Sequence, residues 1–155
     1  MPDDARPSLL QRYVGAGITD ADDERRRLRK ASLTLIVTLI ALLAPAWTVT
    51  YLALGHPVAA AIPALYVTVA VIGLAVLFVT KSDAVLLTTQ VIAIFVLPIA
   101  LQWVLGGFVQ ASAVALWSFS AVLVALVAWG VRAATFVFGA FVAAIVVSGF
   151  IEDGL

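Results

Sequence analysis

Three glutamines are the main uncharged polar side chains in the long apolar part of the chain: Gln90, Gln102 and Gln110. Gln102 and Gln110 flank a Gly-Gly pair, with Trp103 and Phe108 close beside them. An amide in an apolar environment is costly unless it finds a partner, so these side chains are expected to face the interior of the protein. Two interpretations stay open. The amides join helices by hydrogen bonds, or the five residues line a pocket that recognises a ligand without covalent chemistry.

The other polar residues do not suggest catalysis. The chain has no cysteine and a single histidine, His56, in the turn signal Gly-His-Pro. Residues 84–131 contain no acidic or basic side chain, which argues against an ion-coupled transporter. Nucleotide-binding glycine loops, paired membrane carboxylates and clusters of metal ligands are not evident in the sequence. We therefore expect no catalytic residue, metal site or cofactor in this chain, and no nucleic-acid partner.

The charges gather in the first thirty residues, which hold seven of the nine Lys and Arg. Acidic residues come first in the segment 19–33, and basic residues follow, an order that suits a helix dipole. We predict a helix there that continues into the apolar part. Its basic residues are expected to anchor the chain to anionic lipid headgroups: Arg25, Arg26, Arg27, Arg29 and Lys30.

Composition indicates that lipid is the solvent for most of the chain. Hydrophobic residues make up 64% of it and charged residues only 12%, with a mean hydropathy of +1.15. A soluble domain has about 45–50% apolar and about 25% charged residues. We therefore expect an all-α membrane protein, a polytopic bundle of transmembrane helices.

The number of spans depends on the uncharged tract 84–130. A crossing needs about 20 apolar residues, so this tract is too long for one helix. Its strongest helix-breaking signal is Gly106-Gly107. We predict five spans within residues 31–150, at about 31–54, 58–80, 84–105, 108–129 and 131–150.

The positive-inside rule then orients the chain. An arm of residues 1–30 in the cytoplasm puts Lys81 and Arg132 on the same side, and a tail of residues 151–155 on the other. This orientation predicts a multi-pass membrane protein with its N-terminus in the cytoplasm. Because five spans are an odd number, we expect this chain to hold five spans of a six-span domain. A complete five-span protein is the alternative.

Several residues within the spans favour helix packing. Small residues in the last span form two stripes that allow close approach of another helix, in the bundle or between protomers: Gly139, Ala140, Ala143, Ala144 and Ser148. Trp47 and Tyr51 are interpreted as part of an aromatic belt, and Trp117 as a packing residue.

Together these features resemble the N-terminal membrane domain of bacterial class III adenylate/guanylate cyclases. The matching stretches are DADDERRRLRKASL, YLALGHPVAAAIP, LPIALQWVLGGFVQASAVALWSF and RAATFVFGAFVAAIVVSG, and the resemblance covers residues 19–149. Similar modules precede some sensor histidine kinases. The family's sixth span, signalling helix and catalytic domain have no counterpart here, so no catalytic residue can be transferred.

The resemblance implies a membrane-embedded receptor and dimerisation domain that controls cyclic-nucleotide signalling. It further implies a location in the bacterial inner membrane with a cytoplasmic N-terminus, a homodimer, membrane lipids as partners and a lipophilic ligand. The alternatives are the membrane domain of a sensor histidine kinase, a small transporter-like protein or a structural membrane protein.

Overall fold

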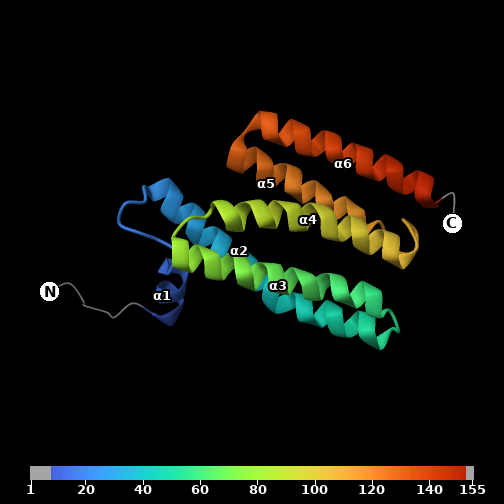
Figure 1. The fold of residues 1–155 in the computed structure, drawn as a ribbon, viewed down its shortest axis with the longest axis horizontal. Helices are drawn as coiled ribbons and strands as arrows, with labels where there is room; N and C mark the ends of the chain where they lie inside the picture. Colours follow the sequence, from blue (N-terminus) through green and yellow to red (C-terminus); the bar gives the residue numbers. More distant parts are fainter. Residues whose placement is uncertain (1–7, 153–155) are drawn as a thin grey trace.

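The basic segment and the first apolar tract form one continuous helix, α2 (Glu24–Ala53), in the computed structural model, which describes residues 8–152 (Figure 1). Asp23 caps this helix, because its carboxylate accepts a hydrogen bond from the backbone N–H of Arg26 at 2.8 Å. The helix continues past Pro45. The basic residues therefore extend the first apolar helix, as their pattern predicts.

Two further long helices follow, α3 (Pro57–Thr80) and α4 (Ala84–Leu105). Proline at the first position of α3 suits a helix start, since that residue needs no amide donor. Lys81 ends α3 in the left-handed region with φ 58°, and Gly106 ends α4 in the same region with φ 98°. Both turns lie where the sequence predicts them.

The next helix begins later than predicted. Residues 107–113 form turns, followed by the 3₁₀ helix η1 (Val114–Ser118) and the helix α5 (Phe119–Trp129). Ser112 and Ala113 have φ of 51° and 53°, a conformation that interrupts a right-handed helix. The predicted span 108–129 is therefore wrong at its start, because these two residues add a second break after the Gly-Gly pair.

The ends of the chain also differ from the prediction. A short helix, α1 (Leu9–Gly15), lies within the N-terminal arm, where none is predicted. The last helix, α6 (Val131–Glu152), continues into the predicted tail of residues 151–155. Residues 1–7 of the arm and 153–155 of the tail lie outside the described residues.

All elements of the described residues are helical, and four helices are long and apolar enough to cross a membrane: α2, α3, α4 and α6. The continuous pair η1 and α5 is shorter, at 16 residues. At about 2.0 Å per residue for the 3₁₀ turn and about 1.5 Å for α5, it is about 27 Å long, less than the roughly 30 Å hydrocarbon layer.

The helices run back and forth along the long axis of the molecule, and each packs mainly on its neighbour in the chain (Figure 1). The starts of α2, α4 and α6 lie at one end, which we call the inner end. The turns at 54–56 and 106–113 lie at the other, the outer end. Large apolar side chains are exposed along these helices, including Val127 (88%) and Phe136 (79%), as expected where lipid surrounds the protein.

Buried side chains of α2, α3 and α4 form the core of the molecule. Its members are mostly small or aliphatic: Val37, Ala44, Tyr66, Ala70, Leu74, Leu77, Leu86 and Ala93. The core therefore joins the first three long helices, while α5 and α6 are added to the α4 side (Figure 1).

The N-terminal arm folds back onto the inner end of this core. Tyr13 packs edge-on against Phe78 with ring centroids 5.5 Å apart, and its hydroxyl shares a hydrogen bond of 2.7 Å with the Thr38 hydroxyl. The buried Gly17 lies against Leu77. Residues 13–17 of the arm are therefore part of the folded structure.

Replacing Gly17 with alanine is predicted to loosen the arm. The new Cβ would lie 2.8 Å from Cγ of Leu77, which is fully buried and cannot retreat. Such overpacking costs about 1–3 kcal/mol. We expect tryptic cleavage after Arg12 to become severalfold faster. Gly15→Ala is the matched control, since nothing lies within 4 Å of its Cβ position, and equal cleavage of both variants would contradict the docking of the arm.

Candidate functional site

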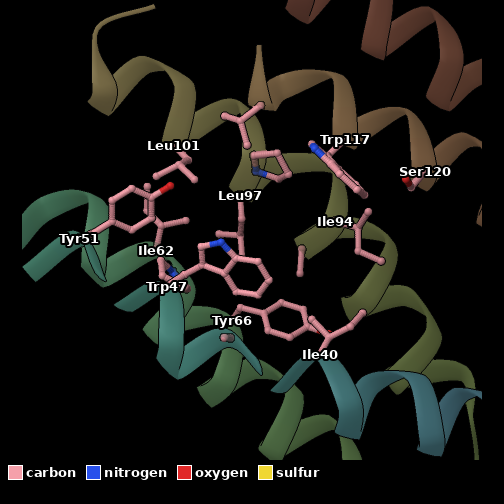
Figure 2. A pocket seen from close by; sticks show the side chains of 15 residues that line it. Ile40, Trp47, Tyr51, Ile62, Tyr66, Ile94, Leu97, Leu101, Trp117 and Ser120 are labelled. Atoms are coloured by element: carbon pink, nitrogen blue, oxygen red, sulfur yellow. The ribbon is translucent and has the colours of Figure 1, made fainter. Parts of the chain in front are cut away.

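A cavity of about 620 Å³ opens in the outer half of the helix bundle (Figure 2). Helices α2 and α3 form one side of it, with Ile40, Ala44, Trp47, Tyr51, Ile62, Pro63 and Tyr66. Helix α4, η1 and α5 form the other side, with Ala93, Ile94, Leu97, Pro98, Leu101, Val114, Trp117 and Ser120. The volume lies within the range of about 300–1,000 Å³ that is usual for small-molecule sites.

Aromatic rings dominate the side formed by α2 and α3. Figure 2 shows Trp47 between Tyr51 and Tyr66, facing Leu97 of α4. Trp117 of η1 lies on the opposite side of the cavity, near Ile94. The cavity is therefore bounded by flat rings from helices that are far apart in the sequence.

The cavity lining contains few polar groups and no Asp, Glu, Lys, Arg or His. The buried Tyr66 donates a hydrogen bond of 2.9 Å to Oε1 of Gln90, which fixes its ring between α3 and α4. Both Trp47 and Trp117 carry an indole N–H, and Tyr51 and Ser120 each carry a hydroxyl. The arrangement suits the binding of a molecule through apolar contacts and a few hydrogen bonds.

Prolines in two helices border the cavity. Pro63 of α3 and Pro98 of α4 both line it, and each removes one hydrogen bond from its helix. Beside Pro98, the buried Ser118 hydroxyl donates a hydrogen bond of 2.7 Å to the Phe95 carbonyl, which joins η1 to α4. A membrane helix tolerates the hydrogen bond missing at a proline where neighbouring side chains bind its backbone polar groups.

The predicted pocket residues lie close to this cavity, but none of the five lines it: Gln90, Gln102, Trp103, Phe108 and Gln110. The helix-joining interpretation describes Gln90 and Gln102 better, because both are buried and each accepts a hydrogen bond from another element. Gln110 is exposed in the outer turn. The structure does not bring the five residues together around one space.

Gln102 fixes the reversal of the chain after α4. Its side chain is fully buried, and Oε1 accepts a hydrogen bond of 3.2 Å from the backbone N–H of Ala115. That N–H lies in the first turn of η1, where helix donors lack partners within the helix. A side chain from α4 therefore caps the following helix.

Substitution of Gln102 tests this role. Gln102→Met keeps the length of the side chain but leaves the Ala115 N–H buried without an acceptor, which lowers the free energy of unfolding by about 1–3 kcal/mol. Removal of the unpaired Gln102 Nε2 group offsets part of this cost. We expect a lower apparent unfolding temperature of the purified protein in detergent. Gln110→Met, at an exposed position of the same turn, should leave that temperature unchanged. Equal shifts for the two variants would contradict the capping role.

The small residues of α6 separate into two faces. Ser148 is buried and Ala140 and Ala144 are partly buried, whereas Gly139 and Ala143 are exposed. Nε1 of Trp103 donates a hydrogen bond of 2.8 Å to the Ser148 hydroxyl, which joins α4 to α6. The first stripe therefore packs inside the protein, and the second lies on its surface.

The five basic residues of the predicted membrane anchor also fall into two groups, one paired within the protein and one exposed. Lys30 is only 3% exposed, and its ammonium group donates hydrogen bonds of 2.6 Å to the Asp22 carboxylate and to the Lys81 carbonyl. Arg29 pairs with Asp83 at 2.6 Å. These contacts, which we call the inner clasp, tie the arm and α2 to the turn between α3 and α4.

The remaining members of the basic run are exposed. Arg27 contacts Asp20 at 3.5 Å and donates a hydrogen bond to the Asp22 carbonyl. Arg25 and Arg26 are exposed in the first turn of α2. Binding of lipid headgroups stays a prediction for these exposed arginines, whereas the Lys30 side chain is buried and hydrogen-bonded within the protein.

The Asp22 carboxylate of the inner clasp is ionised at physiological pH. Hydrogen bonds from the Lys30 ammonium and from the backbone N–H of Thr19 lower the pKa of Asp22 from 3.8 to about 2. A lowered carboxyl pKa stabilises the fold above the ordinary value, and this stabilisation is lost as the pH falls from 3.8 towards about 2. Asp22 therefore keeps its negative charge, and its hydrogen bond from Lys30, at neutral pH.

Sequence reasoning missed the cavity residues because each was interpreted separately. A usable signal exists in α2, where Ile40, Ala44, Trp47 and Tyr51 follow one another at spacings of three and four. Residues at these spacings share one face of a helix. The opposite side could not be found in this way, since Trp117 faces α2 only because the chain reverses at 106–113.

Within residues 8–152, no group of three or more His, Cys, Asp or Glu side chains is arranged to hold a metal ion. Comparison of the chain with protein-family models, curated proteins and solved structures gives no match.

Proposed function

We propose that this chain is the membrane-embedded receptor and regulatory domain of a bacterial class III adenylate/guanylate cyclase. Two lines of support meet in this proposal. One is the resemblance of residues 19–149 to such domains. The other is an apolar cavity that contacts the same helix as the inner clasp.

The observation that carries the proposal is the course of α2. This helix contributes Trp47 and Tyr51 to the outer cavity, and Arg29 and Lys30 to the inner clasp. Its 30 residues form one continuous rod about 45 Å long. A molecule that changes the position of α2 at the outer end therefore changes the strain on the clasp at the inner end.

A ligand would act by shifting a pre-existing equilibrium between two packings of α2 against α3 and α4. It can do so only if it binds one packing more tightly than the other. Prolines 63 and 98 border the cavity and reduce the hydrogen bonding of α3 and α4 there, which eases such a change. The inner clasp would transmit it to the cytoplasmic output domain.

The proposal includes a topology and an assembly. The N-terminal arm lies in the cytoplasm of a bacterium, α5 completes a fifth crossing despite its length, and a sixth helix completes the domain. Two copies associate as a homodimer, for which the exposed Gly139 and Ala143 offer a close approach. A sensor kinase output fits the same arrangement, whereas an ion-coupled transporter does not, because no charge lines the cavity.

The test uses the complete gene product that contains this chain, produced in a bacterium that lacks its own adenylate cyclase. A matched variant carries an unrelated dimeric membrane anchor in place of residues 31–150. We expect both proteins to make cyclic nucleotide, and only the native protein to respond severalfold to a lipid extract of the host membrane. Cyclic nucleotide levels in isolated membranes provide the measurement.

Unchanged regulation after the exchange would reduce the domain to an anchor and contradict the receptor proposal. Autophosphorylation in place of cyclic-nucleotide synthesis would overturn the cyclase assignment in favour of a kinase. A gene product without either output domain would contradict both.

A further inference from the structure

We propose that the outer cavity binds a neutral, planar lipophile that carries carbonyl acceptors, the chemistry of the quinone class. The inference deepens the proposed function and rests on it for its biological meaning. Binding itself can be measured without any output domain.

Neutrality follows from the charges around the cavity. None of its lining side chains is cationic, and the nearest clustered cations, Arg29 and Lys30, lie at the inner end and are paired with carboxylates. A fatty-acid carboxylate or a phosphate in the cavity would therefore lie in an apolar site without a counter-charge. An uncharged molecule avoids this cost.

Planarity follows from the rings that bound the space. Trp47, Tyr51 and Tyr66 approach it from α2 and α3, and Trp117 approaches it from η1 (Figure 2). Aromatic rings prefer stacked or edge-on contacts with other flat groups. A volume of about 620 Å³ accommodates a bicyclic ring with substituents.

The ligand needs hydrogen-bond acceptors because the polar groups of the cavity lining are mainly donors. Among the four aromatic side chains, Tyr66 has its hydroxyl committed to Gln90 within the described residues. The indole N–H groups of Trp47 and Trp117 can only donate, and the Tyr51 hydroxyl can donate as well. Trp47 and Trp117 border the cavity with 53% and 72% of their surface exposed, and a donor at such an apolar boundary is unfavourable without an acceptor. Carbonyl oxygens of a ligand would satisfy these groups.

Aromatic residues are common at membrane interfaces, where they contact headgroups. That role alone does not account for Trp47 and Trp117, because both border one cavity from opposite sides. An interfacial role also does not explain why Ile40 and Ala44, nearer the middle of α2, line the same cavity.

The experiment compares three probes on the full chain, purified and placed in lipid nanodiscs. Menadione is a methylated naphthoquinone with two carbonyl acceptors, and 2-methylnaphthalene has the same ring size without them. Dodecanoate represents an anionic acyl chain. The protein has no cysteine, so the quinone cannot form a thiol adduct. Saturable binding of radiolabelled menadione above that of empty nanodiscs is the readout, with the other two probes as competitors.

We expect menadione to saturate one site per chain. The hydrocarbon and dodecanoate should compete at least roughly tenfold more weakly, a difference that corresponds to about one hydrogen bond. Trp47→Phe and Trp117→Phe keep a ring but remove a donor, and each should weaken menadione binding about fivefold to tenfold. Trp129→Phe, outside the cavity, is the matched control and should bind normally.

Equal competition by 2-methylnaphthalene would overturn the role of acceptors, and stronger competition by dodecanoate would assign the cavity to acyl chains. Binding that matches empty nanodiscs, or equal losses in all three tryptophan variants, would overturn the site itself. If menadione binds as expected but the exchange of residues 31–150 leaves regulation unchanged, the ligand class stands and the receptor function fails. If the exchange alters regulation but menadione does not bind, the receptor function stands and the ligand class fails.

Discussion

The structure depends on how an uncharged tract reverses direction after α4. Residues 84–130 are too long to cross a membrane once as a helix, so the chain must turn, and a buried backbone N–H at the turn needs an acceptor. Gly106 and Gly107 start the turn, and the residues at 112–113 complete it in the left-handed region. Gln102 then accepts the hydrogen bond from Ala115. Removing that one acceptor leaves the start of the next helix without its cap.

This reversal also shapes the candidate site. Because the turn uses residues 107–113, α5 begins late, and η1 brings Trp117 opposite α2 in the outer half. The resulting space lies between the α2–α3 pair and the α4–η1 segment (Figure 2). At the inner end, Lys30 and Arg29 hold α2 in place through the clasp. One helix thus connects a cavity that is open to apolar molecules with a charged cluster near the predicted cytoplasmic surface.

The sequence predicts the long helices well because their limits are local signals. Pro57, Lys81, Gly106 and Gly130 each mark a boundary that the structure reproduces. Residues 112–113 could not be found in this way, since serine and alanine rarely adopt positive φ and nothing nearby predicts it. The burial of Lys30 was equally hidden, because its partners come from the arm and from the α3–α4 turn. The cavity was missed for the same reason, as it exists only where distant segments meet.

The proposed function requires the short α5 to cross the membrane, and the α5–α6 turn lies at the same end of the molecule as the α3–α4 turn (Figure 1). Labelling of single cysteines with a membrane-impermeant thiol reagent tests this directly, since the native chain contains none. Cysteine at Ser82 and at Arg132 should react from the same side of the membrane, and cysteine at Gln110 from the opposite side. Reaction of the Arg132 position from the side of Gln110 would contradict the account.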